Sequence, residues 1–482
     1  MTKFQKQIIF AVAALLLAGA LLAVYLMMSP SEDAEKDKTQ EVTPTETRDE
    51  HGHLLRNDRP FILDPLEASE IKKIRVHNPD DEYVLLNRGD SWSFEGAFEY
   101  EIDLEKVSTL RTNARYLLAV EMVEDADLDN IDKYGINKKD PAVWFEVEHK
   151  GGKYRVLVGD KTPDSNGYYA VLEGRDLLYI IDTGVEESFH LVLNDYVKPV
   201  IADNISTSEI MSLERLSIFR GGDAFLRVEE VKDKLTYGNN STHRLTYPVT
   251  GHATNLTNFS TFLDSMSEIT CEKTLLFGDF VTPEALAELG FVLEGDDHTC
   301  DYTMIAEYPK QDIHLHFIED GDNYIIYSES KNIVVSAPKT TFPHMEWELI
   351  SWISSEVYLL DIYDVASIEI ITPKTQTLFE LSGEEDIVVM CAGKPVPSLD
   401  FKKAYQSIMY VLVTDWGTLP ENTDELMGIV VTLESGEVLD YRFHAASAVN
   451  TFYTLNGAGQ FYVEREKVIE LRSTFEALVP QS

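Results

Sequence analysis

A block of four predicted strands that recurs twice is the feature that most constrains the fold of this chain. The first block runs from Val143 to Asp182, where apolar and polar residues alternate as in strands with one buried face. Three turn-forming stretches separate its strands: Gly151-Gly152, Thr162-Pro163-Asp164 and Glu173-Gly174. Blocks of the same layout begin at Met304 and Val430. The chain is therefore expected to consist mostly of one unit used three times.

Each block belongs to a longer series of predicted elements. An opening strand contains Ile74, Leu216 or Ile368, positions about 150 residues apart. A helix follows each opening strand, the strand block comes next, and a closing helix ends the series. The sequence therefore predicts an α+β fold in which three repeated modules each pack a mostly antiparallel sheet against two helices.

The helices are predicted from apolar residues at three- and four-residue steps. The first helix of each module is expected to begin at an N-cap residue, Asp103, Asn255 or Asp400. Its apolar face is expected to comprise Leu104, Val107, Leu110, Ala114, Leu117 and Leu118, then Leu256, Phe259, Phe262, Leu263, Met266 and Ile269, then Phe401, Ala404, Ile408, Val411 and Leu412. The closing helices are expected to bury Val185, Phe189, Val192 and Tyr196, then Trp347, Ile350 and Ile353, then Val468, Leu471, Phe475 and Leu478.

The sequence of the N-terminal region predicts a membrane anchor. Residues 8–28 carry no charged side chain, and about 20 apolar residues are enough to cross a bilayer as a helix. Lys3 and Lys6 precede this run and acidic residues follow it, so the positive-inside rule places the N-terminus in the cytoplasm and the rest of the chain outside. A cleaved signal peptide is the alternative, because Ala18-Gly19-Ala20 would suit a cleavage site. The length of the run favours an uncleaved anchor.

The predicted organisation divides the chain into six parts. These are a cytoplasmic stub at 1–7, a transmembrane anchor at 8–28, a flexible linker at 29–67, and α+β modules at 68–203, 204–361 and 362–482. The linker is predicted from its polar, charged composition, and its His51 and His53 are expected to be exposed.

Composition narrows the classes of partner. The net charge of −42 repels nucleic acid and anionic lipid at long range, so neither is an expected partner, while cations or basic partners are favoured. An acidic surface that only keeps the protein soluble is the plainer interpretation. Cys271, Cys300 and Cys391 include no CxxC pair, which argues against a disulfide framework and a structural zinc site. Cys271 and Cys300 could be bridged, although free buried thiols are the favoured alternative.

Several motifs of the first module occur together in a known family. They are an Ile-x-x-Ile-x-Val opening strand, Trp92 within Asp-Ser-Trp-Ser-Phe, a Tyr134-Gly135-Ile136 turn, and the stretch from Val156 to Gly174. With the apolar N-terminus, they resemble the bacterial domain-of-unknown-function family 4340, best over residues 70–182 and less well in the later copies. Leu289-Gly290-Phe291 stands where the turn is expected in the second copy, and the third copy has no counterpart. The resemblance implies a membrane-anchored extracytoplasmic protein, often associated with ABC-type transport systems of the gliding-motility-like kind. It supplies no catalytic residues.

Two groups of residues resemble parts of metal sites. Asp125, Asp127, Asp129 and Asp132 imitate the start of a calcium loop, but Ile136 stands where a bidentate Glu is needed, so a solvated acidic turn is favoured. His314 and His316 share one strand face, but no third ligand is identifiable, so two half-exposed histidines are favoured.

The remaining candidate is a recognition loop. Its members combine acidic, amide and aromatic groups suited to sugars or peptides: Asp160, Asp164, Asn166, Tyr168 and Tyr169. No catalytic, cofactor-binding or metal-binding residue is identified, and no enzyme is expected. The expected function is that of a single-pass, extracytoplasmic accessory protein that contacts ABC-type permease or ATPase components. The alternative is a module that binds an envelope saccharide or peptide.

Overall fold

The structure is a computed structural model that describes residues 47–203, 205–231, 241–249, 252–267, 269–293, 300–383, 386–421 and 423–480. The anchor predicted at 8–28 lies outside these residues. Over the ranges described, no helix is both long and apolar enough to cross a membrane. The chain divides into two compact units, Met1–Asp64 and Pro65–Ser482.

The described part of the first unit contains a two-stranded antiparallel sheet of β1 (Leu55–Arg56) and β2 (Arg59–Pro60). His53 is buried, and its ring Nδ1 lies 2.8 Å from Oδ2 of Asp49. The expectation that His53 is exposed is therefore wrong. Polar composition predicted a linker here, but it does not reveal a local turn closed by an Asp–His hydrogen bond.

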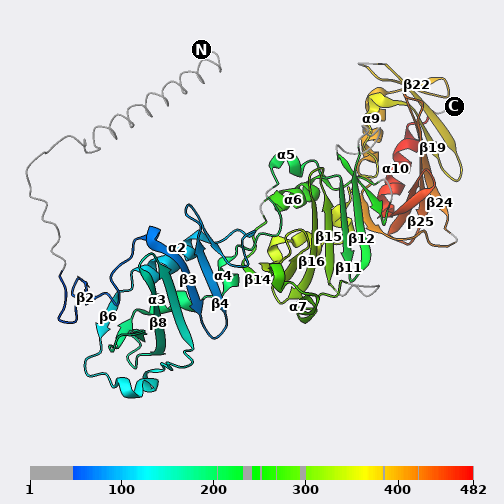
Figure 1. Ribbon diagram of the computed structural model, residues 1–482. Coiled ribbons are helices and arrows are strands. Elements are labelled where there is room, and N and C mark those ends of the chain that lie inside the picture. Colours follow the sequence, from blue (N-terminus) through cyan, green and yellow to red (C-terminus); the bar gives the residue numbers. More distant parts are fainter. Residues whose placement is uncertain are drawn as a thin grey trace, which may run out of the picture. The chain divides into compact units, whose positions relative to one another are not determined.

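The second unit contains three antiparallel sheets (Figure 1). Sheet 1 has the strand order β5-β4-β3-β7-β8-β9-β10-β6. Its strands are β3 (Ile71–His77), β4 (Glu82–Asn87), β5 (Trp92–Phe94), β6 (Ala119–Met122), β7 (Val143–His149), β8 (Gly152–Lys161), β9 (Tyr168–Leu172) and β10 (Tyr179–Ile181). The four-strand block predicted from Val143 to Asp182 thus forms β7 to β10, and this prediction is confirmed.

Sheets 2 and 3 repeat the arrangement. Sheet 2 has the order β13-β12-β11-β15-β16-β17-β18-β14, and sheet 3 has the order β22-β21-β20-β19-β24-β25-β26-β27-β23. The strands of sheet 2 are β11 (Arg215–Arg220), β12 (Asp223–Glu230), β13 (His243–Tyr247), β14 (Lys273–Phe277), β15 (Tyr302–Glu307), β16 (Asp312–Asp320), β17 (Asn323–Ser328) and β18 (Ile333–Pro338). Those of sheet 3 are β19 (Val365–Ile371), β20 (Gln376–Ser382), β21 (Val388–Cys391), β22 (Lys394–Val396), β23 (Val413–Trp416), β24 (Glu425–Leu433), β25 (Val438–Ala445), β26 (Asn450–Leu455) and β27 (Ala458–Glu464).

The three sheets share one strand order, and sheet 3 adds β22 at its edge. The residues expected to be equivalent, Ile74, Leu216 and Ile368, all lie fully buried in the corresponding strands β3, β11 and β19. A mixed α+β fold built on antiparallel sheets is therefore confirmed.

Helices pack on each sheet. The longer ones are α2 (Leu104–Arg115), α3 (Thr183–His190), α6 (Leu256–Ser267), α9 (Ser398–Ile408) and α10 (Arg465–Ala477). The shorter ones are α4 (Leu193–Tyr196), α5 (Thr207–Ile210), α7 (Pro283–Glu288), α8 (Leu349–Trp352), η1 (Ala68–Glu70), η2 (Leu128–Tyr134), η3 (Gly278–Phe280), η4 (Lys339–Thr341), η5 (Pro343–Met345) and η6 (Ile362–Asp364). Contacts join α2 to α3, α6 to α8 and α9 to α10, so each sheet carries a helix pair.

Some helix predictions need correction. Asp103 caps α2 as expected, with its side chain accepting from the backbone N–H groups of Glu105 and Lys106. Asp400 is not a cap, because α9 begins earlier, after Pro397, and Asp400 lies in its first turn. Leu104 and Leu256, the first residues of α2 and α6, were expected inward but are exposed. At a first helical position the side chain lies beyond the sheet that buries the later turns.

The closing helices also differ from expectation. Only α10 is a full helix that buries Val468, Leu471 and Phe475. In sheet 1 the helix is interrupted, because Leu191 adopts an extended conformation and α4 restarts after it. In the segment that closes the second module, only the single turn α8 is α-helical. Apolar spacing predicted the buried faces but could not show where the backbone leaves the helix.

A second apolar cluster covers the other face of sheets 1 and 2. In sheet 1 it includes Ile136, which follows Gly135. In sheet 2 it includes Phe291, which follows Gly290. Both glycines have positive φ, 74° and 97°, which an L side chain rarely adopts. The expected correspondence of the Tyr-Gly-Ile and Leu-Gly-Phe turns is therefore confirmed.

Candidate functional site

Two glycines bring the Tyr-Gly-Ile turn onto the end of β8. A Cβ on Gly159 would lie 2.2 Å from the backbone oxygen of Tyr134 and 2.5 Å from Cγ1 of Ile136. A Cβ on Gly135 would lie 2.3 Å from Cγ of Asp160. Only residues without a side chain permit this approach. The pairing of β8 with β9 also shifts register between Val158 and Lys161, so the strand end departs from the regular ladder.

A cavity of about 570 Å³ opens beside this contact. Its wall is formed by the ends of β8 and β9 and by one face of α3. The lining residues that carry charge or an aromatic ring are Asp160, Lys161, Tyr168, Glu186, Glu187 and His190. All of them belong to sheet 1 and its helix, so a single module forms the cavity.

Glu186 is the most enclosed charged group of the cavity, with 3% of its side chain exposed. Its carboxylate forms an ion pair with Nε2 of His190, one helical turn later, and accepts a hydrogen bond from the hydroxyl of Tyr168. Burial raises the pKa of Glu186, and the nearby His190 opposes that shift. Burial, with the neighbouring Glu186 charge, also raises the pKa of Tyr168. A buried carboxylate with a shifted pKa at a cavity is a typical feature of a binding site.

The remaining charges leave the cavity negative. Asp160 and Glu187 form no ion pair with any described residue. Lys161 Nζ lies 5.9 Å from the centroid of the Tyr168 ring, at the outer limit of a cation–π contact. Two free carboxylates, one buried carboxylate and an aromatic face suit a positively charged group.

The structure separates the residues of the predicted recognition loop. Asp160 and Tyr168 line the cavity. Asp164 is held in a closed turn, where it accepts hydrogen bonds from the Thr162 hydroxyl at 2.6 Å and the Asn166 amide at 2.8 Å. The Thr162 hydrogen bond is the main reason that the pKa of Asp164 is lowered.

The fifth residue of the loop faces away from the cavity. Tyr169 packs on Tyr134 in the cluster on the opposite face of sheet 1, with ring centroids 4.9 Å apart. Adjacent strand residues point to opposite faces, so Tyr168 and Tyr169 could never share a site. The residues that the sequence analysis missed are Glu186, Glu187 and His190 of α3. The four-residue spacing of Glu186 and His190 was the one available indication.

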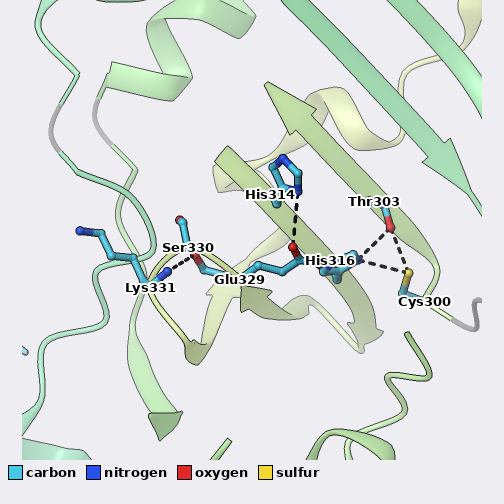
Figure 2. Close-up of polar contacts among 8 residues, drawn as sticks. Cys300, Thr303, His314, His316, Glu329, Ser330 and Lys331 are labelled. Carbon is cyan, nitrogen blue, oxygen red and sulfur yellow. Dashed lines mark hydrogen bonds and ion pairs between the residues drawn. The ribbon is translucent and has the colours of Figure 1, made fainter. Parts of the chain in front are cut away.

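The two strand histidines meet a third residue in sheet 2 (Figure 2). Oε1 of Glu329 lies 2.8 Å from Nε2 of His316, and its Oε2 lies 3.4 Å from Nδ1 of His314. The other ring nitrogen of His316, Nδ1, lies 3.1 Å from the Thr303 hydroxyl and 3.9 Å from the Cys300 sulfur. His316 is buried, which corrects the expectation that both histidines are half exposed. The Glu329 carboxylate already contacts Nε2 of His316 and Nδ1 of His314, the nitrogens that a metal ion would need.

The structure also bears on the predicted acidic turn around Asp127 and on the three cysteines. Asp127 accepts hydrogen bonds from Asn130 and pairs with Lys133 at 3.2 Å, as in a solvated turn. In the part of the chain that the structure describes, no three His, Cys, Asp or Glu residues are arranged to hold a metal ion. Cys271, Cys300 and Cys391 are all free, so the alternative of a Cys271–Cys300 bridge is wrong.

Comparison with known proteins finds a resemblance to one family. Residues 92–291 match the family model described as "Domain of unknown function (DUF4340)". The match spans sheet 1 from β5 onward and the first part of sheet 2, and it includes both glycine turns. The resemblance expected from the motifs is thus confirmed. Comparisons with curated proteins and with solved structures found no match.

Proposed function

We propose that this chain is a membrane-anchored, extracytoplasmic interaction protein that presents three versions of one module to partner proteins. The observation that carries the proposal is the outer edge of sheet 3. There β23 is the last strand of the sheet, only its start is covered, by Ser355 and Glu356, and the chain around it exposes four large apolar side chains: Tyr410, Leu412, Trp416 and Leu419. An edge strand with exposed apolar groups can pair with a strand of another protein.

The anchor and its orientation rest on the sequence. The uncharged run at 8–28 follows Lys3 and Lys6, which supports a single span with the modules outside. The expected partners, ABC-type permease or ATPase components, rest on the resemblance alone. No catalytic role is part of this proposal.

In-cell crosslinking tests the partner proposal. An epitope-tagged full-length chain is crosslinked in its native membrane, and the retained proteins are identified by mass spectrometry. We expect specific recovery of transporter subunits from the wild type and reduced recovery from Trp416→Glu. The matched control is Phe98→Glu, which charges an exposed aromatic position in the first module. Recovery of no membrane protein, or equal recovery from Trp416→Glu, would count against the proposal.

A second function is favoured by the cavity of sheet 1. The alternative of an envelope saccharide- or peptide-binding module requires an enclosed site with polar and aromatic groups. Asp160 and Tyr168, both expected in the recognition loop, line a cavity that carries such groups, although it is open to solvent. This binding function is compatible with the interaction role, because the cavity and the edge strand β23 belong to different sheets.

A further inference from the structure

The last strands of sheets 2 and 3 pair with their neighbours in the same irregular way. The pairing of β14 with β18 shifts register between Thr274 and Leu276. The pairing of β23 with β27 shifts register between Val413 and Asp415. One residue is bulged at the same place in both strands, so their positions can be matched one by one. The corresponding positions are Thr274 and Val413, Leu276 and Asp415, Phe277 and Trp416, and Gly278 and Gly417.

In sheet 2, the first module covers both ends of this strand. At the start of β14, the Thr274 hydroxyl donates to the carbonyl oxygen of Val197 at 2.8 Å and is buried. At the end of β14, the rings of Tyr100 and Phe277 pack with centroids 5.0 Å apart, and Phe277 is fully buried. The Tyr100 hydroxyl also accepts from the backbone N–H of Gly278 at 2.9 Å. The edge of sheet 2 is therefore closed by the preceding module.

In sheet 3, the preceding module covers only the start of the corresponding strand. The backbone N–H of Val413 donates to the carbonyl oxygen of Ser355 at 2.7 Å, and Glu356 forms an isolated antiparallel bridge with Leu412. At the end of β23, Trp416 is 43% exposed, whereas the corresponding phenylalanine of β14 is fully buried. We call Ser355 and Glu356 the strap, because they lie over the start of an edge that is otherwise uncovered.

The strap borders an open volume. A cavity of about 650 Å³ is lined by Ser354, Glu356 and Val357 together with residues of β26, β27 and the turn between them. Ser355 and Glu356 are themselves only half-buried. Few side chains therefore pack against the strap, and few contacts are lost when it moves.

The chain is fixed on both sides of the strap. Before it, the backbone N–H of Ser354 donates to the carbonyl oxygen of Ala253 at 2.8 Å. After it, the buried Tyr358 donates from its hydroxyl to the hydroxyl of Tyr405 in α9 at 3.0 Å. The strap can therefore leave β23 by a local opening, while the contacts of its flanking residues stay in place.

We propose that the strap is an autoinhibitory cover of the β23 edge. When closed, it occupies the start of the strand and shortens the edge that a partner strand can pair with. When it leaves, Leu412 to Trp416 form one continuous edge. Edge strands are normally protected against pairing with other chains, and the strap supplies that protection until a partner competes for the same backbone groups. This inference rests on the proposed function and adds the regulation of the same surface.

Hydrogen exchange, resolved to single amides by mass spectrometry, tests on the purified full-length chain in detergent whether the strap opens. The amides of Val413 and Ser354 both donate to backbone carbonyls, at 2.7 and 2.8 Å, but only Val413 donates to the strap. We expect a protection factor roughly tenfold lower for Val413 than for Ser354, because opening of the strap frees only Val413. Equal protection of the two amides overturns the proposal.

Two adjacent serines provide a matched pair of variants. The Ser354 hydroxyl donates to the carboxylate of Glu356 and accepts from its backbone N–H at 3.4 Å. The side chain of Ser355 forms no hydrogen bond with any described residue, and only its carbonyl oxygen contacts β23. Ser354→Ala should therefore lower the protection of Val413 several fold, and Ser355→Ala should leave it unchanged. Equal effects of the two variants would show that Ser354 does not hold the strap closed.

A disulfide between the strap and the strand tests its effect on partner binding. Opposite residues of an antiparallel pair lie about 4.5–5.5 Å apart at Cα, which is within the range of a disulfide, so Glu356→Cys combined with Leu412→Cys should lock the strap. In-cell crosslinking compares this variant in its oxidised form with the same variant reduced by tris(2-carboxyethyl)phosphine. The reduced form is the matched control, because it carries the same two substitutions. We expect it to retain several-fold more membrane protein than the oxidised form. Equal recovery overturns the proposal.

Failure of the proposed function gives a different result. If the wild type retains no membrane protein, the β23 edge is not an interaction surface in the cell. Hydrogen exchange does not depend on a partner, so it still decides whether the strap opens.

Discussion

At the scale of single residues, His344 shows how burial couples stability to pH. Its ring is fully buried among aromatic side chains, and neither ring nitrogen has a hydrogen-bond partner. Burial lowers the pKa of His344 to about 3. The unfolded chain, with an ordinary histidine pKa near 6.5, therefore binds a proton that the folded chain cannot bind between these pH values.

The first prediction follows from that difference. Stability should fall as pH decreases from about 6.5 towards 3, with His344 contributing up to about 1.4 kcal/mol per pH unit. His344→Leu should lose stability less steeply over the same range. Urea unfolding at several pH values measures both slopes. His243 and His252 also have lowered pKa values through burial, so the comparison is the difference between variant and wild type. Equal slopes would show that His344 does not stay neutral in the folded state.

Gly159 gives a second prediction at this scale. Gly159→Ala places a Cβ against the backbone oxygen of Tyr134, which cannot rotate away as a side chain can. We expect a loss of about 1–3 kcal/mol in unfolding free energy, because the turn must move off β8. Gly184→Ala, in the first turn of α3 with its nearest contact at 3.4 Å, is the control and should change stability little. A Gly159→Ala variant as stable as the control would contradict the close contact.

At the scale of elements, strands were easier to predict than helix ends. Alternation and turn residues located β7 to β10 because both are local properties of the sequence. Helix ends depend on which residue leaves the helical conformation, and this was missed at Asp400 and Leu191. Apolar residues at three- and four-residue steps are compatible with one continuous helix or with two turns separated by an extended residue.

The two aspartates provide a matched pair of helix variants. Asp103→Ala should cost about 1 kcal/mol, because its carboxylate accepts from two backbone N–H groups at the start of α2. Asp400→Ala should cost only a few tenths of a kcal/mol, because Asp400 lies within α9 and supplies no cap. Chemical unfolding of both variants measures the difference. Equal losses would show that Asp400 does cap its helix.

At the scale of the whole molecule, the repeat could be predicted but the site could not. Equivalent positions such as Ile74, Leu216 and Ile368 are visible in the sequence because each is the buried centre of an opening strand. The cavity depends instead on tertiary contacts between β8, β9 and α3. Glu186 reaches Tyr168 only after α3 packs on the sheet, and no local pattern reports that contact.

In-cell crosslinking of the tagged full-length chain tests the central claim most directly, namely that the modules contact partner proteins through the edge of sheet 3. The account predicts that the wild type retains membrane partner proteins and that Trp416→Glu, which charges an exposed position of β23, retains less of them. Equal recovery from the wild type and from Trp416→Glu would contradict the claim.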